Sequence, residues 1–172
     1  MLTGLTLVAL LVLTPEAFAQ RDAGAKARGD YSGTFWSTRS ANRSVRHARD
    51  YSQGAREYIQ ATPKASPQYL RADAAEVGRN VAAAKAEVTY LKAQAARDKE
   101  LLSAVTSIEK HLTAAEKEHE TFDAECAKDT IDSKATMACC SALSDHLTKA
   151  ADELEALQKK LTPKPTAPNP KK

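Results

Sequence analysis

Aromatic residues and glycines are scarce in this sequence. Only 5% of its 172 residues are aromatic and six are glycine, and no alternating run of apolar and polar residues is long enough to indicate a β-strand. Ala, Glu, Lys, Leu and Arg are abundant instead, which is typical of helical proteins. The composition therefore argues against a sheet protein, and the length predicts a single all-α domain.

The compact motifs of enzymes and metal proteins are also missing. The sequence contains no CxxC, HExxH or CxxCH motif, no glycine-rich phosphate loop and no glycine elbow around a serine. Without such a motif, the sequence indicates neither a paired acid and base nor an activated nucleophile. We therefore expect a protein that is not an enzyme and has no cofactor.

No basic residue precedes the first apolar run, although secretory signals usually carry one. The apolar run over residues 2–13 is followed by Ala-Phe-Ala at residues 17–19, a pattern that signal peptidases accept. We expect residues 1–19 to be a signal peptide. A membrane-spanning helix needs about 20 apolar residues and this run is shorter. The mature chain is therefore predicted to be secreted or periplasmic and not membrane-spanning.

Apolar residues in the rest of the chain recur at alternating spacings of four and three, which is the pattern of helices that pack along coiled-coil-like seams. We expect an irregular arm over residues 20–37 and a disordered tail, rich in Pro and Lys, over residues 162–172. Between them, residues 38–161 are predicted to form an antiparallel, coiled-coil-like helical bundle of three or four helices.

Three helix starts can be placed by their capping residues. The first helix is expected to be capped within residues 37–40 and to stop before Pro63, the second to begin at Ser66, and the last to begin at Asp132 or Ser133. The seam of the first helix is lean, so this helix should bury little apolar area. Its members are Ala41, Val45, Ala48, Ser52, Ala55 and Ile59.

The middle of the predicted bundle leaves two structures open. No glycine or proline marks a turn near residues 95–101, yet the seam loses a residue there, because the earlier register leads to Glu109 and the later stripe passes through Ile108. One helix of about 60 residues would be on the order of 90 Å long. A break near Arg97-Asp98 would instead give a compact bundle of four similar helices.

The three cysteines are expected to include one disulfide, because export would place them where disulfides persist. An antiparallel hairpin of the last two helices brings Cys126 level with Cys139 and Cys140. We expect Cys126 to pair with Cys140, which lies on the seam, in preference to Cys139. Such a bridge would stabilise the fold by about 3 kcal/mol in the chain-entropy model, and the remaining thiol could be inert, reactive or paired between two chains.

Two histidines suggest an alternative function. His119 and His146 each lie seven residues from a cysteine on the same stripe, so an antiparallel hairpin should bring them to one level, about 10 Å from the sulfurs. The alternative hypothesis is a metal-binding or redox protein of the envelope. It would hold copper or zinc through Cys126, Cys139 and Cys140, or through the histidine pair.

A row of arginines suggests a further alternative. Arg39, Arg43 and Arg46 line up at i, i+4 and i+7 on the outer face of the first helix, where they could bind an anionic polymer of the envelope. The net charge of +3 is too small to indicate a nucleic-acid partner. The leading hypothesis is an exported, non-catalytic helical module with a structural or binding role and an unknown ligand, whose candidate partners are a second copy of the chain or an envelope component.

Overall fold

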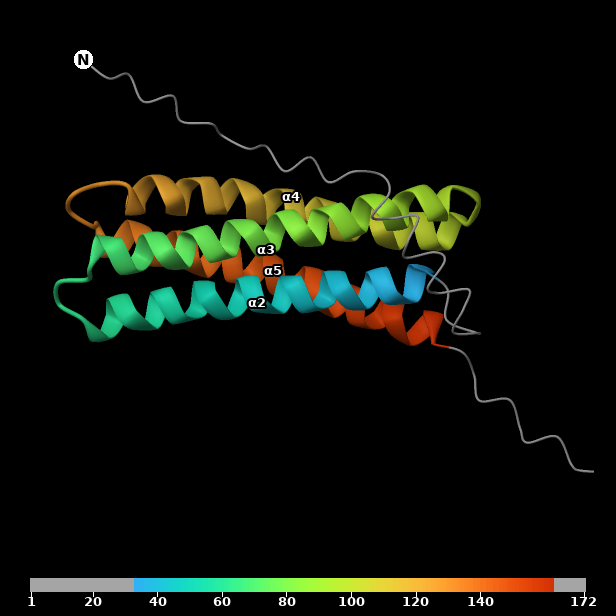
Figure 1. Ribbon diagram of the computed structural model, residues 1–172, viewed down its shortest axis with the longest axis horizontal. Helices are drawn as coiled ribbons and strands as arrows, with labels where there is room; N and C mark the ends of the chain where they lie inside the picture. The colour runs from blue at the N-terminus through green and yellow to red at the C-terminus, as the bar shows by residue number, and fades with distance from the viewer. Residues whose placement is uncertain (1–32, 163–172) are drawn as a thin grey trace, which may run out of the picture. The chain divides into compact units, whose positions relative to one another are not determined.

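The computed structural model describes residues 33–162, which form four long helices and no strand (Figure 1). This confirms the predicted all-α class and the alternative with four helices. The predicted signal peptide, most of the predicted arm and almost all of the predicted tail lie outside the described residues. The helices are α2 (Gly33–Ala61), α3 (Pro67–Gln94), α4 (Lys99–Cys126) and α5 (Ser133–Leu161), with a short 3-10 helix, η1 (Ala95–Arg97), between α3 and α4.

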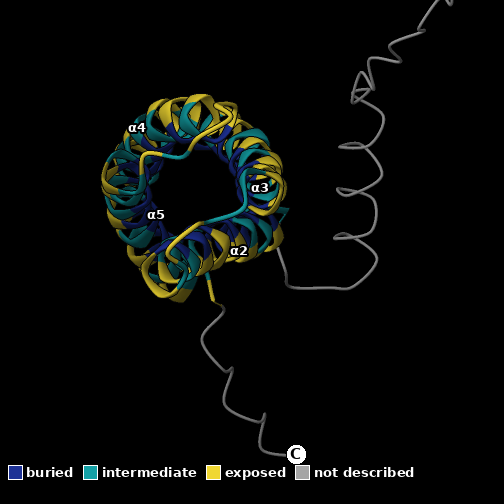
Figure 2. Cartoon of the chain, turned by 90° about the vertical axis from the view of Figure 1, so that its left-hand side faces the viewer, coloured by how far each residue is buried: buried dark blue, intermediate teal, exposed yellow. Residues whose placement is uncertain are grey.

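Successive helices run in opposite directions and lie side by side as a four-helix bundle (Figure 1). Seen end-on, the buried residues of all four helices face a common interior (Figure 2). The helix α4 packs against both α3 and α5. Two buried hydrogen bonds join α2 to α5, because Ser52 Oγ donates to the Cys140 carbonyl oxygen at 3.0 Å and Ser144 Oγ donates to Ser52 Oγ at 3.1 Å.

The lean seam of α2 is confirmed. Its six predicted members are all buried, but they are mostly small. Among the described residues, the twelve largest fully buried side chains include one from α2, Val45, and eleven from α3, α4 and α5. The apolar area that stabilises the core therefore comes mainly from the other three helices.

The connection between α3 and α4 is a break, so the single long helix is wrong. After η1, Asp98 leaves the helical conformation and caps α4, its Oδ1 accepting from the backbone N–H groups of Glu100 and Leu101, each at 3.0 Å. A carboxylate cap and a tight turn therefore replace the glycine or proline that usually marks such a turn. The apolar repeat therefore shifts by one residue at this turn, between α3 and α4, and not within a helix.

The other predicted caps are confirmed. Ser66 precedes Pro67 and its side chain accepts from the Tyr69 N–H at 3.5 Å. Asp132 caps α5 by accepting from the N–H groups of Lys134 and Ala135, each at 3.0 Å. Both caps satisfy N–H groups that have no partner within their own helix.

The helix α2 begins earlier than predicted. Residues 33–37, predicted as part of an irregular arm, are helical, and the predicted cap within residues 37–40 is wrong. Phe35 and Thr38 are buried and extend the inner side of α2 toward its start. The Thr38 hydroxyl donates to the Thr34 carbonyl oxygen one turn back, at 2.8 Å, instead of capping a helix.

Candidate functional site

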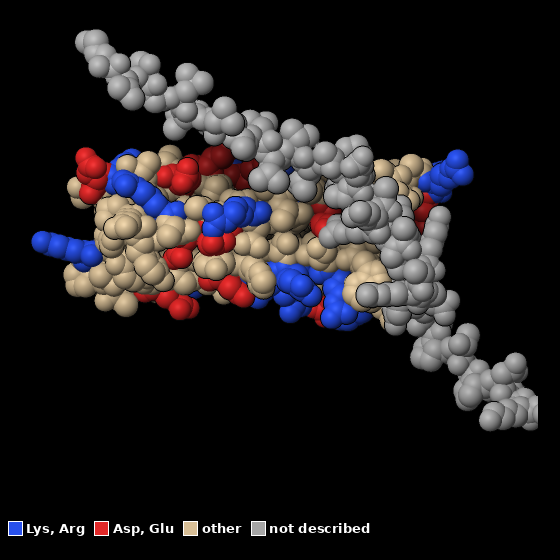
Figure 3. Space-filling view, in the orientation of Figure 1, with Lys and Arg blue, Asp and Glu red and all other residues tan. Residues whose placement is uncertain are grey.

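A groove lined by basic side chains lies between α2 and α5 and is the candidate site; we call it the basic groove. The structure brings the predicted arginine row of α2 together with Lys159 from the last turns of α5, and Figure 3 shows Lys and Arg side chains gathered on the first half of α2. The groove has a volume of about 750 Å³. It is lined by Arg39, Asn42, Arg43, Arg46, His47, Asp50, Glu155, Gln158, Lys159 and Thr162.

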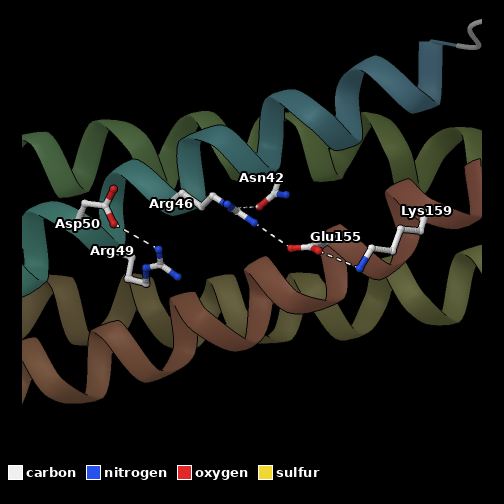
Figure 4. A network of polar contacts seen from close by, with 6 residues as sticks. All are labelled: Asn42, Arg46, Arg49, Asp50, Glu155 and Lys159. Atoms are coloured by element: carbon white, nitrogen blue, oxygen red, sulfur yellow. Dashed lines mark hydrogen bonds and ion pairs between the residues drawn. The ribbon is translucent and has the colours of Figure 1, made fainter. Parts of the chain in front are cut away.

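One carboxylate in the basic groove is shared by two cations (Figure 4). Glu155 Oε1 accepts from Lys159 Nζ at 2.9 Å, and Glu155 Oε2 accepts from Arg46 Nη2 at 2.9 Å. The hydrogen bond and charge of Lys159, followed by those of Arg46, lower the pKa of Glu155. Arg46 Nε also donates to Asn42 Oδ1 at 3.3 Å, which orients the guanidinium toward α5.

The other two arginines of the groove have no carboxylate partner in the part of the chain that the structure describes. The guanidinium carbon of Arg39 lies 5.6 Å from the centre of the Trp36 ring, a cation–π contact that leaves its charge uncompensated. Arg43 is exposed and makes no ion pair or hydrogen bond with any residue between 33 and 162. The second carboxylate of the groove, Asp50, already contacts Arg49 at 3.4 Å (Figure 4). The basic groove therefore carries an excess of positive charge.

The predicted sulfur site has a different structure from the expected one. Cys126, Cys139 and Cys140 are buried near the turn between α4 and α5, as predicted, but all three are free thiols, so the Cys126–Cys140 disulfide is not formed. The end of α4 is held instead by Arg71 of α3, which donates to the carbonyl oxygens of Cys126 at 2.7 Å and Ala127 at 3.0 Å. These charged hydrogen bonds tie the end of α4 to α3, and the hairpin of α4 and α5 is held by packing between the two helices.

Burial keeps the three thiols protonated. It is the main cause that raises the pKa of Cys126 to about 12 and that of Cys140 to about 12, with contributions from the neighbouring thiols. Burial also raises the pKa of Cys139. Because the thiolate is the form that attacks electrophiles and binds metals, these cysteines have the character of core residues.

The structure does not bring His119 and His146 together. The Nε2 atom of His119 lies 2.8 Å from the Ala74 carbonyl oxygen of α3, so this side chain faces α3 instead of α5. His146 lies beside His111, with ring centres 6.1 Å apart. Within the described part of the chain, no group of three His, Cys, Asp or Glu side chains is arranged to hold a metal ion.

Sequence reasoning found the arginine row but missed its partners on α5. Neither Lys159 nor Glu155 was identified from the sequence as part of this site. The spacing of Glu155 and Lys159, i and i+4 on one helix face, was a signal that they form a pair. Their position opposite Arg46 depends on how α2 packs against α5, which no local pattern reports.

No helix within residues 33–162 is both long and apolar enough to cross a membrane. Comparison of the chain with protein-family models, with curated protein sequences and with solved structures gives no match. A functional proposal for this chain therefore has to be argued from the charges and contacts of its own residues.

Proposed function

We propose that this protein is a non-catalytic helical binding module whose basic groove binds an anionic polymer. The observation that carries the proposal is the imbalance of charge in the basic groove. Four cations line it, one carboxylate is shared by two of them, and the other carboxylate is already in contact with a cation outside the groove. An anionic ligand would compensate the two remaining arginines.

The spacing of the cations favours a polymer over a single small anion. Arg39, Arg43 and Arg46 extend over about 10 Å of the helix axis, and Lys159 faces them from α5. A chain with a charge on each repeating unit can meet several of these cations in turn. Guanidinium groups suit this role because they bind carboxylate and phosphate oxygens with two parallel hydrogen bonds.

Glu155 acts in this proposal as an internal anion that a polymer displaces. Its ion pair with Arg46 is solvent-exposed, with 49% and 43% of the Arg46 and Glu155 side chains accessible. Exposed pairs of this kind contribute about 0 to 1 kcal/mol. A polymer that makes several contacts can therefore compete with Glu155. The predicted signal peptide supports a cell-envelope polymer as the natural ligand.

The test measures binding of heparin and of long-chain polyphosphate, two model polyanions, to the purified protein by fluorescence anisotropy. Replacing Arg39, Arg43 and Arg46 by Ser should weaken binding about a hundredfold, since each cation near an anionic surface contributes about 1 kcal/mol. Binding should also weaken when salt shortens the Debye length from about 30 Å to about 3 Å. The single change Glu155→Gln should strengthen binding, because it frees Arg46 and Lys159.

A matched control separates a defined groove from general attraction to a basic protein. Arg79, Lys110 and Lys134 are exposed cations outside the groove, and replacing all three by Ser changes the net charge by the same amount. This control variant should retain most of the binding. If it loses as much affinity as the groove variant while both remain helical by circular dichroism, the basic groove is not the binding site.

A further inference from the structure

A second hollow lies next to the basic groove, where α2 faces α3, and shares His47 and Asp50 with it; we call it the tyrosine hollow. Its volume is about 380 Å³. Both hollows contain carboxylates, but the tyrosine hollow also has aromatic rings and, unlike the basic groove, is lined by no Lys or Arg side chain. The residues that line it are His47, Asp50, Tyr51 and Gly54 of α2 and Tyr69 and Asp73 of α3.

Among residues 33–162, the carboxylate of Asp73 has no partner of opposite charge. Asp73 is 9% exposed and lines the tyrosine hollow, yet it makes no hydrogen bond or ion pair with any other described residue. Burial, followed by the nearby charge of Glu76, raises the pKa of Asp73. The carboxylate oxygens of Asp73 are not fully buried, so water in the hollow solvates them, and a cation that displaced this water would compensate the charge directly.

The two tyrosines supply the other half of the site. Tyr51 is 40% exposed and Tyr69 is 51% exposed. Tyr69 packs on Tyr58, with ring centres 4.5 Å apart, and the Tyr58 hydroxyl accepts from the Ser66 N–H at 3.0 Å, so the Tyr69 ring is held in place. Aromatic faces attract cations through the quadrupole of the ring.

Gly54 leaves the hollow open on the α2 side. A Cβ atom at this position would meet no other atom within 4 Å. The hollow therefore has space beside a negative charge and two aromatic rings, and its size lies at the lower end of small-ligand sites. A small organic molecule with an ammonium or guanidinium group would fill the space, pair with the negative charge and pack on the aromatic rings.

We propose that the tyrosine hollow binds an organic cation, with Asp73 as the counter-charge and Tyr51 and Tyr69 as the aromatic walls. The proposal does not depend on the basic groove, because it concerns a ligand of opposite charge held by Tyr51, Tyr69 and Asp73, none of which lines that groove. The cation could be a quaternary ammonium compound or a guanidinium-bearing molecule. Both ligands carry a positive charge on an organic group, and the experiment below distinguishes a quaternary ammonium ligand from a guanidinium ligand.

Binding should depend on pH through Asp73. A bound cation favours the ionised carboxylate, so protons compete with the ligand and affinity falls as the pH is lowered through the pKa of Asp73. The other charged or titratable groups around it are Asp50 and His47 on α2, Glu76 on α3, and the thiols of Cys126 and Cys140 behind it on α4 and α5. The thiols stay neutral at these pH values, because burial raises the pKa of Cys126 and that of Cys140 to about 12.

The test is an NMR titration of the whole protein with choline, with arginine amide and with 3,3-dimethylbutan-1-ol, the uncharged analogue of choline. We expect at least one of the two cations to shift the ring signals of Tyr51 and Tyr69, and the uncharged analogue to have no effect. Binding of choline indicates a quaternary ammonium ligand, and binding of arginine amide indicates a guanidinium ligand. If neither cation binds, or if the uncharged analogue binds equally well, the proposal is wrong.

Three variants assign the effect to the hollow. Asp73→Asn keeps the shape of the side chain and should weaken binding on the order of tenfold or more. Gly54→Leu keeps the carboxylate but fills the hollow, and should weaken binding similarly. Asp145→Asn removes an exposed carboxylate of α5 and should leave binding unchanged. Unchanged affinity in both hollow variants, or an equal loss in Asp145→Asn, would overturn the proposal.

Discussion

Two glycines within helices should respond in different ways to the same substitution. Gly54 lies within α2 and Gly78 within α3. A Cβ atom at Gly54 would meet nothing within 4 Å, whereas at Gly78 it would lie 2.8 Å from Cε1 and 2.9 Å from Nε2 of His119. Replacing each glycine by alanine therefore tests the contact between α3 and α4 against a control in the same protein.

The gain in helix propensity is common to both substitutions. Alanine is favoured over glycine in a helix interior by about 0.8 to 1.0 kcal/mol. At Gly54 nothing opposes this gain, so the free energy of unfolding should rise by about that amount and Tm by about 3 °C.

At Gly78 the gain is opposed by the imidazole of His119. The new methyl group must displace the ring, which loses the hydrogen bond from Nε2 to the Ala74 carbonyl oxygen, 2.8 Å long. Such a bond contributes about 0.5 to 1.5 kcal/mol, and the moved ring also loses packing contacts. We therefore expect Gly78→Ala to be about neutral or destabilising, and about 1 to 2 kcal/mol less stable than Gly54→Ala.

Urea unfolding followed by circular dichroism measures both free energies. The decisive comparison repeats Gly78→Ala in a His119→Ala background, where the ring is gone and the substitution should recover the gain seen at Gly54. The reasoning is refuted if Gly78→Ala stabilises the wild-type protein as much as Gly54→Ala does. It is also refuted if the effects of Gly78→Ala and His119→Ala simply add.

Two further predictions concern the break between helices and the thiols. Asp98→Ala removes the cap of α4 and should lower the free energy of unfolding by about 1 kcal/mol, whereas Asp98→Asn should lower it much less; equal losses in urea unfolding would contradict the capping role. Because burial raises the pKa of Cys126 and of Cys140 to about 12, iodoacetamide should modify them slowly at pH 8 in the folded protein and rapidly in urea. Mass spectrometry counts the modified thiols, and rapid modification of the folded protein would show that they are not protected as the structure indicates.

The repeat of apolar residues was sufficient to predict most of the fold. Burial in a helical bundle follows a period that can be read along the chain, so the lean seam of α2 was predicted correctly. The caps at Ser66 and Asp132 were predicted correctly from their residue types. The break at Asp98 stayed open because its signal is a single capping residue. The early start of α2 was missed because Phe35 was assigned to the arm, although its burial extends the helix.

The candidate sites were harder to predict because they depend on which neighbouring helix a side chain faces as well as on its height along the bundle. Spacing along an antiparallel pair of helices indicates which residues lie at the same height. It does not indicate which of two neighbouring helices a side chain faces. His119 was predicted to face α5 but it contacts α3, and His111 takes the place beside His146. For the same reason Arg39, Arg43 and Arg46 could be aligned on one helix, but the partner of Arg46 on α5, Glu155, could not be identified.

The lean seam of α2 accounts for the position of both candidate sites. Because its buried residues are small, the long side chains of α2 lie along its two flanks, basic toward α5 and aromatic or acidic toward α3. His47 and Asp50 line both hollows, so each site shares part of its lining with the other. A ligand in either site contacts α2 together with a neighbouring helix and stabilises the folded state by mass action. Binding would therefore reinforce the helix that contributes least to the apolar core.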